Sequence, residues 1–491
     1  MKYINRKFEL IETIMIVIIF FNIIFSGCIN PPSLNSKQST LEKDNNIENP
    51  LKINNQNVTI LEDPNDNNET VPLDIKDVNA LIPKNNEEYN ESIPKDKEEN
   101  KEEILENLDD NNNETIKELY GVVDAINQFA IDFYLELIRN NKENIFFSPY
   151  SISTAFAIAY EGARGKTASE IQLVFHFPEN NDIRRNDFLK ICNEINKEEK
   201  KYNLSTANAL WAEKSYKFLA EYFNIIEKYY GGNVTNLDFI NDPEGSRKII
   251  NSWVENQTNE KIKNLIPQGV IDELTRLVIT NAIYFKGNWK IPFDEDYTSE
   301  KDFYINSNNS IKVPMMYLKD SFNYTKTKDF QILELPYESD ELSMLILLPN
   351  ENNLSSYEGS INIKNLSEWK NNLTETKIKI YIPKFKFETK YEMKETLKEM
   401  GMQSAFNPKY VDFSGMDGTK NLYIKSVIHQ AFVEVNEVGT EAAAATTVIG
   451  GVLSMPPPTP VFRADHPFIF LIHHKESGNI LFMGKVVDPT S

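Results

Sequence analysis

A long run of small residues between two strand patterns constrains this chain more than any other feature. It extends from Glu437 to Pro458, and its first half lacks the Asp, Asn, Ser and Pro that surface loops use to turn. If residues 440–447 become extended, Thr440 and every second residue after it form a small, uncharged face. We therefore expect an exposed loop that can later become a buried central strand.

Helical patterns dominate the first part of the remaining sequence. From Val122 to Leu137 the apolar residues recur on one helical face, which predicts an amphipathic helix. Ser148 followed by Pro149 is typical of a helix start, with a capping hydroxyl and a proline at the first helical position.

Strand patterns dominate the later part. Residues Leu277 to Phe285 and Ser343 to Leu348 are apolar runs of strand length, which favours strands buried on both faces. Two further runs, Phe468 to Ile472 and Ile480 to Met483, flank a turn sequence and predict a hairpin. Helices early and strands late indicate the α+β class.

Six ordered blocks of sequence resemble the serpin family, and the similarity covers residues 122–489. The blocks are Asn144–Ile152, Gly162–Ile171, Thr280–Trp289, Val433–Ala442, Phe462–Phe468 and Leu481–Val486. The resemblance implies a serpin fold with about three β-sheets and nine helices, and a reactive-centre loop at Glu437 to Pro458. It also implies inhibition of serine proteases by a suicide mechanism, in which the cleaved loop inserts into a sheet while still esterified to the enzyme.

The resemblance also assigns parts of the loop. The bond expected to be cleaved is Leu453–Ser454, although the cut could lie one or two positions away. Leu453 suits an apolar specificity pocket, as in chymotrypsin-like or subtilisin-like enzymes. The hinge that must insert first comprises Glu437, Gly439, Thr440, Ala442, Ala443, Ala444, Ala445 and Thr446. A short helix at Ala442–Ala445 is the alternative, because Ala is the best helix former.

Two polar groups match positions where serpins control sheet opening. Ser148, Ser151, Asn281 and His429 correspond to a cluster beneath the opening sheet; the simpler alternative is a helix cap and a satisfied core histidine. Glu437 and Lys384 correspond to an ion pair beside Trp289, near the start of the loop, and we expect this pair to be exposed.

Nothing in the sequence predicts an enzyme, a metal site or a cofactor. The five histidines show no His-Glu-x-x-His spacing, and no Gly-x-Ser-x-Gly or phosphate-binding loop is present. The segment Arg184 to Lys201 occupies the place of the family's glycosaminoglycan-binding helix, but its basic residues alternate with acidic ones. We therefore do not expect activation by a heparin-like polymer.

The distribution of charge along the chain limits the kinds of partner that the protein is expected to bind. The net charge of −21 argues against binding nucleic acid. Much of the acidity lies in Leu41 to Glu118, an Asn-rich and aromatic-poor segment that predicts a disordered tether. We expect a monomer.

The N-terminus has the pattern of an export signal. Residues Ile14 to Phe25 are apolar except for one Asn, follow three basic residues and precede Ser-Gly-Cys28, which resembles a prokaryotic lipobox. A lipid on Cys28 would leave Cys192 as the only other cysteine, so no intrachain disulfide is expected. The alternative is an uncleaved membrane-spanning helix, although a dozen apolar residues are short for one.

The expected organisation is therefore a signal at 1–28, an acidic tether at 29–121 and a serpin domain at 122–489. The protein would sit on the extracellular face of the cell membrane through its lipid, or otherwise be secreted. The expected function is inhibition of serine proteases with apolar specificity. The alternatives are a non-inhibitory binding or structural serpin and a cross-class inhibitor of papain-like cysteine proteases.

Overall fold

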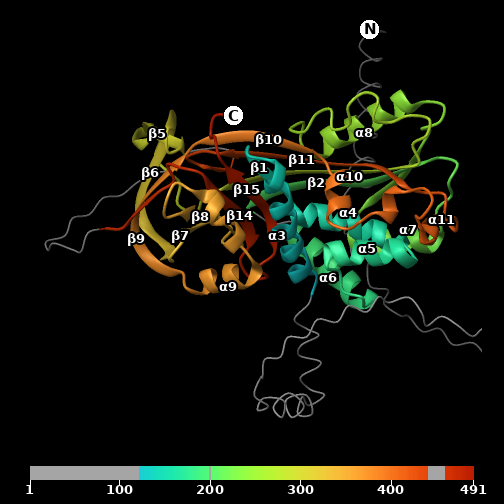
Figure 1. Cartoon of the computed structure of the whole chain (residues 1–491), viewed down its shortest axis with the longest axis horizontal. Helices are drawn as coiled ribbons and strands as arrows, with labels where there is room; N and C mark the ends of the chain where they lie inside the picture. The colour runs from blue at the N-terminus through green and yellow to red at the C-terminus, as the bar shows by residue number, and fades with distance from the viewer. Residues whose placement is uncertain (1–120, 198–200, 441–458) are drawn as a thin grey trace, which may run out of the picture. The chain divides into compact units, whose positions relative to one another are not determined.

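The structure is a computed structural model that describes residues 121–197, 201–440 and 459–491. The expected signal and tether, the rest of the hinge beyond Thr440, and the Leu453–Ser454 bond lie outside the described residues. Within the described part, helices cover both faces of a β-sheet whose strands lie across the centre of Figure 1. None of the described helices combines the length and the apolar character needed to cross a membrane.

The two helices that the sequence predicts begin at the expected residues. The first expected helix extends three residues further than its apolar pattern, and Ser148 caps the second by accepting the backbone N–H of Ser151, with Pro149 at the first helical position. The described α-helices are α3 (Val122–Asn140), α4 (Pro149–Gly162), α5 (Gly165–Phe175), α6 (Asn181–Ile195), α7 (Ala220–Tyr230), α8 (Pro243–Gln257), α9 (Ile363–Asn371), α10 (Lys394–Glu399) and α11 (Ser414–Asp417).

The strands form two hydrogen-bonded sheets. They are β1 (Ile145–Phe147), β2 (Tyr202–Glu213), β3 (Asn233–Leu237), β4 (Leu277–Asn288), β5 (Ser299–Asn306), β6 (Asn309–Lys326), β7 (Phe330–Pro336), β8 (Leu342–Pro349), β9 (Thr374–Pro383), β10 (Phe385–Glu392), β11 (Ile424–Val435), β12 (Gly439–Thr440), β13 (Val461–Arg463), β14 (Phe468–His474) and β15 (Ile480–Val486).

The six-stranded sheet has the order β10-β11-β4-β2-β3, with β12 paired to β4. Its two central strands, β11 and β4, run parallel. Both faces of this sheet are covered, because α8 packs on one side with Trp211 and Val278 while α4 packs on the other with Leu210 and Ile279. This explains the continuous apolar run of β4, since neither of its faces meets water.

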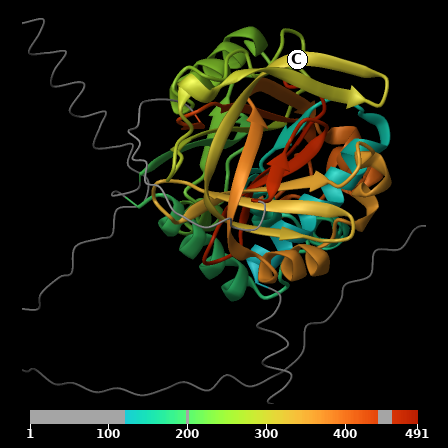
Figure 2. The ribbon, with the colours of Figure 1, turned by 90° about the vertical axis from the view of Figure 1, so that its left-hand side faces the viewer.

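The nine-stranded sheet has the order β1-β15-β14-β8-β7-β6-β9-β13, with β5 also on β6. The predicted hairpin is present as the antiparallel pair β14 and β15. The resemblance implied three sheets, whereas the described strands join into two. The 18-residue strand β6 pairs with β5 and β9 along most of its length and with β7 at its far end, which connects what would otherwise be separate sheets. Figure 2 looks onto the end of the molecule formed by β5, β6 and β9.

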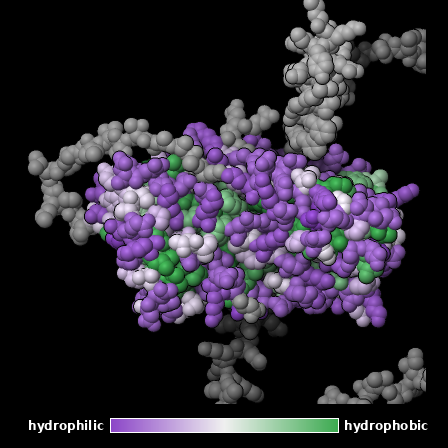
Figure 3. Space-filling view, turned by 90° about the horizontal axis from the view of Figure 1, so that it is seen from above, coloured by the Kyte–Doolittle hydropathy of each residue, from purple (hydrophilic) through white to green (hydrophobic). Residues whose placement is uncertain are grey.

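The surface seen in Figure 3 is mainly hydrophilic. Its hydrophobic residues lie in small groups separated by hydrophilic ones. Most large apolar side chains of the described part are instead in one extensive core between the two sheets and the helices α3 to α7.

Candidate functional site

A polar cluster joins α4 to the two central strands of the six-stranded sheet. Asn281 of β4 donates from Nδ2 to Ser151 Oγ at 2.8 Å and to Asn208 Oδ1 at 2.6 Å. His429 of β11 contacts Asn281 Oδ1 through Nδ1. Ser148 donates its backbone N–H to His429 Nε2 at 3.1 Å and its hydroxyl to the carbonyl of Leu481 at 2.6 Å.

The structure thus brings together Ser148, Ser151, Asn281 and His429, the four residues that the resemblance selected. The simpler alternative, a helix cap and a satisfied core histidine, describes part of the same arrangement. Ser148 does cap α4 and His429 is fully buried and hydrogen-bonded, yet the cluster also bridges β4 to β11, which pair directly at Asn281 and His429. Asn208 of β2 is a fifth member that sequence reasoning missed. Its signal was an amide between two buried alanines, next to the buried run Ala209 to Ala212.

His429 is held in its neutral form. Burial lowers the pKa of its imidazole to about 3. The hydrogen bonds agree with this assignment, because Nε2 accepts from a backbone N–H and Nδ1 then donates to the Asn281 carbonyl oxygen. The ring also stacks on Tyr391 of the neighbouring strand β10.

A second group lies where the chain leaves β11. Glu437 forms an ion pair with Lys384 at 2.8 Å and accepts the Thr298 hydroxyl at 2.8 Å. We expected an exposed pair, which is wrong for Glu437: its side chain is only 4% exposed, against 39% for Lys384. The reason is that the backbone carbonyl of Glu437 accepts the Phe293 N–H, which holds this residue against the segment after β4.

Trp289 completes this second group. Its indole N–H donates to the carbonyl of Asn436 at 3.0 Å, and its backbone N–H donates to the carbonyl of Val438 at 2.8 Å. Burial raises the pKa of Glu437, but the Lys384 ammonium and the Thr298 hydroxyl outweigh that effect, so the pKa lies below its usual value. Glu437 is therefore a carboxylate at neutral pH.

The first residues of the hinge already form a strand, which corrects the expectation that the whole segment from Glu437 is an exposed loop. Strand β12 pairs antiparallel with the end of β4, Gly439 opposite Asn288 and Thr440 opposite Gly287. The direct pairing of β11 with β4 ends before this point, at Phe432 and Tyr284. The chain has therefore started to enter between the two central strands.

Thr440 points into the molecule. Its side chain is buried and its hydroxyl shares a 3.0 Å hydrogen bond with the Tyr337 hydroxyl. Tyr337 in turn stacks on Trp289 with ring centroids 4.8 Å apart. A Cβ on Gly439 would lie 2.2 Å from the Gly287 carbonyl oxygen and 2.6 Å from the Asn288 Cα, so only glycine permits this approach of the two backbones.

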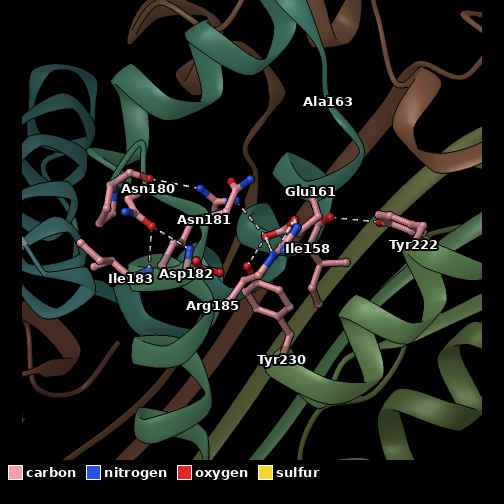
Figure 4. Close-up of polar contacts among 12 residues, drawn as sticks. Ile158, Glu161, Ala163, Asn180, Asn181, Asp182, Ile183, Arg185, Tyr222 and Tyr230 are labelled. Atoms are coloured by element: carbon pink, nitrogen blue, oxygen red, sulfur yellow. Dashed lines mark hydrogen bonds and ion pairs between the residues drawn. The ribbon is translucent and has the colours of Figure 1, made fainter.

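The two arginines of α6 form ion pairs with a buried carboxylate. Arg184 and Arg185 both pair with Glu161 of α4, at 2.9 and 2.7 Å, and Tyr230 of α7 donates to the same carboxylate at 2.6 Å (Figure 4). Burial raises the pKa of Glu161, but the two guanidinium groups and the tyrosine hydroxyl lower it below its usual value. The cluster ties three helices together, so these arginines are not available to a polyanion.

The remaining candidate groups are the cysteine and the side chains that could bind a metal ion. Cys192 is buried and forms no disulfide with another described residue. No set of three or more His, Cys, Asp or Glu side chains within residues 121–197, 201–440 and 459–491 is arranged to hold a metal ion.

Comparisons with known proteins agree with this geometry. Residues 124–489 match a family profile described as "Serpin (serine protease inhibitor)". An uncharacterized serpin-like protein of Methanosarcina acetivorans is 44% identical over 374 residues, which cover 76% of this chain and 87% of the relative. Human leukocyte elastase inhibitor is 41% identical, and the match covers 74% of this chain and 98% of the human protein. The structure of uncleaved ovalbumin superposes with a TM-score of 0.69 at 34% identity, covering 75% of this chain and all of that one.

Three findings identify the family of this chain. They are the family match, the central parallel pair of strands in the six-stranded sheet, and the short strand β12 that starts to enter between them. The chain belongs to the serpin family, whose members are typically non-enzymatic protease inhibitors.

Proposed function

We propose that this serpin traps serine proteases as covalent acyl-enzymes by inserting its cleaved loop between β4 and β11. The observation that carries the proposal is the buried position of Thr440, paired with β4 and hydrogen-bonded to Tyr337. The residues that follow at period two are Ala442, Ala444 and Thr446, which are as small as the position requires. Thr440 lies on the face of the sheet that Tyr337 and α4 share, and side chains of this size can enter there without displacing α4.

The energetics favour trapping. Insertion from Glu437 to Leu453 spans on the order of 50 Å at ~3.3 Å per residue. A dozen new ladder hydrogen bonds, at ~0.5–1.5 kcal/mol each, would provide roughly 10 kcal/mol. Each ~1.4 kcal/mol lost from the protease's transition-state stabilisation slows deacylation tenfold, so a fraction of this energy suffices to disable the enzyme.

The test is to mix the protein with a chymotrypsin-like and a subtilisin-like protease and to analyse the products by denaturing electrophoresis. A complex that survives SDS supports an inhibitor. Cleavage of the loop without such a complex would identify a non-inhibitory serpin instead. Running the same assay with a papain-like enzyme covers cross-class inhibition, which depends on the same residues.

Specificity is expected to follow Leu453, since this apolar side chain would occupy the protease's specificity pocket. Leu453→Arg should lower the rate of inhibition of chymotrypsin-like enzymes about a hundredfold and create inhibition of trypsin-like ones. Mass spectrometry of the cleaved loop gives the bond directly. If the variant inhibits the same proteases as the parent and is cleaved at another position, the reactive bond is not Leu453–Ser454.

Cys28 is proposed to carry a lipid that holds the protein on the outer face of the cell membrane. The Ser-Gly-Cys sequence after a short apolar segment supports this proposal. Cys28→Ser should abolish incorporation of labelled fatty acid. It should also release the protein from the membrane or mislocalise it. A variant that stays fully in the membrane, with an unprocessed N-terminus, would favour an uncleaved anchor.

A further inference from the structure

One outer sheet face next to the reactive loop is basic and aromatic in a protein of strongly negative net charge. It is formed where β6, β9 and β13 lie side by side. Tyr317 of β6, Tyr381 of β9 and Arg463 of β13 stand in one row, because Tyr317 pairs with Tyr381 and Tyr381 pairs with Arg463 in the strand register. Tyr297 extends the row at the β6 side.

The members of this row contact one another. The rings of Tyr317 and Tyr381 have centroids 4.9 Å apart, and the Arg463 guanidinium lies 4.1 Å from the Tyr381 centroid. Tyr297 meets Tyr317 edge-on at 6.1 Å and is 54% exposed. A guanidinium held over an aromatic ring keeps its charge while its orientation is fixed.

Lysines continue the same face in the next two rows. Lys319 pairs with Lys379, which pairs with Val461, and Ser321 pairs with Lys377. Alternation along β9 puts these lysines opposite the buried Ile378 and Ile380. We refer to the side chains of Tyr297, Tyr317, Tyr381, Arg463, Lys319, Lys377 and Lys379 as the basic-aromatic face.

Four cations thus lie in adjacent rows of one face, and no described residue forms an ion pair with any of them. Lysines that form no ion pair with another described residue also occur elsewhere, for example Lys190 and Lys364, so the distinctive feature of this face is that four cations stand together in adjacent rows. Glu375, two residues before Lys377 on β9, is the acidic residue in the next row and is exposed. Like charges placed opposite each other destabilise a sheet, so Lys319 opposite Lys379 has no evident structural benefit.

The position of the face identifies its occupant. The chain returns from the proposed reactive bond into β13, which forms the edge of this face, with only Met455 to Pro460 between Ser454 and Val461. Six residues in extended conformation span roughly 20 Å, which is less than the width of a protease domain. An enzyme engaged at Leu453 would therefore lie over or beside these strands.

We propose that the basic-aromatic face is a docking surface for the attacking protease, and that it selects enzymes whose surface beside the active site is acidic. This inference rests on the proposed function. Arg and Tyr are enriched at the centres of protein interfaces, and the surrounding lysines would accelerate encounter with a negatively charged partner.

The test uses Lys319→Glu/Lys377→Glu/Lys379→Glu, with a matched control. The control, Lys190→Glu/Lys217→Glu/Lys364→Glu, makes the same charge change at three exposed lysines of α6, the segment after β2 and α9. The probes are chymotrypsin and chymotrypsin whose lysines have been succinylated, which converts each ammonium to a carboxylate. The measured quantity is the total rate of loop consumption, trapped plus cleaved, at low and high salt.

Succinylation should accelerate attack on the parent at low salt, and the face variant should slow attack by the succinylated enzyme about tenfold relative to the control variant. The difference should disappear at high salt, because screening removes steering between exposed charges. Equal rates for the two variants, or a difference that persists in high salt, would overturn the proposal.

The two proposals remain distinguishable. The partition between trapped and cleaved product reports on the inhibitory mechanism, whereas the total rate reports on the face, even if every molecule is cleaved as a plain substrate. A nucleic-acid surface is the competing assignment. If a single-stranded oligonucleotide binds the parent but not the face variant, and the protease rates are equal, that assignment replaces the docking surface.

Discussion

Thr440→Arg is expected to turn this serpin from an inhibitor into a substrate. The Thr440 side chain is buried against Tyr337, so an arginine there would place an unpaired guanidinium at the point where the loop enters the sheet. An uncompensated buried charge costs several kcal/mol, and ~3 kcal/mol would slow insertion about a hundredfold. Deacylation by water would then precede trapping.

The measurement is the fraction of protease in SDS-resistant complex, together with the melting temperature after cleavage. The variant should be cleaved at the normal rate, form few complexes and gain little thermal stability on cutting. Thr440→Ser is the matched control, because it keeps the hydroxyl that bonds Tyr337. Glu441→Arg, predicted to lie on the opposite face of the extended segment, should change the outcome much less.

Gly439→Ala tests the same step by steric hindrance. The added methyl would approach the Gly287 carbonyl oxygen and the Asn288 Cα more closely than two backbones allow, and neither of these atoms belongs to a flexible side chain. Strand β12 should leave the sheet, and trapping should fall without any charge having been introduced. If both Thr440→Arg and Gly439→Ala trap protease as well as the parent, the insertion mechanism is wrong for this chain.

The local features of the fold could be predicted because each depends on neighbouring residues. The cap at Ser148, the buried run of β4 and the hairpin of β14 and β15 follow from capping chemistry and periodicity alone. The run of small residues after Glu437 could be recognised as unusual for a loop, and its described residues Gly439 and Thr440 form strand β12.

The contacts between distant segments could not be predicted in the same way. Burial of Glu437 depends on Phe293, and the role of Asn208 depends on the antiparallel register that puts it opposite Asn281. The polar side chains alone gave no indication of either partner. Likewise, the alternating charges of the α6 segment argued only against a polyanion site and did not predict that Arg184 is buried, which depends on Glu161 at the end of another helix.

His429 is expected to make stability fall as the pH drops below about 6.5, the ordinary histidine pKa. In the folded protein burial lowers its pKa to about 3, so between these values the unfolded chain binds a proton that the native state does not. Stability from this group is therefore complete above the unfolded pKa and declines with falling pH until the folded pKa is reached. At pH 4 the loss is about 3 kcal/mol.

Other groups titrate over the same range, so the effect is measured as a difference between the parent and His429→Gln. At pH 7.5 the variant should be the less stable of the two, because Gln cannot reproduce both bonds that His429 makes to Asn281 and to the Ser148 N–H. As the pH falls toward 4 the parent alone loses the histidine contribution, so the two free energies of unfolding should converge. A gap that stays constant between pH 7.5 and 4 would mean that His429 is not held neutral.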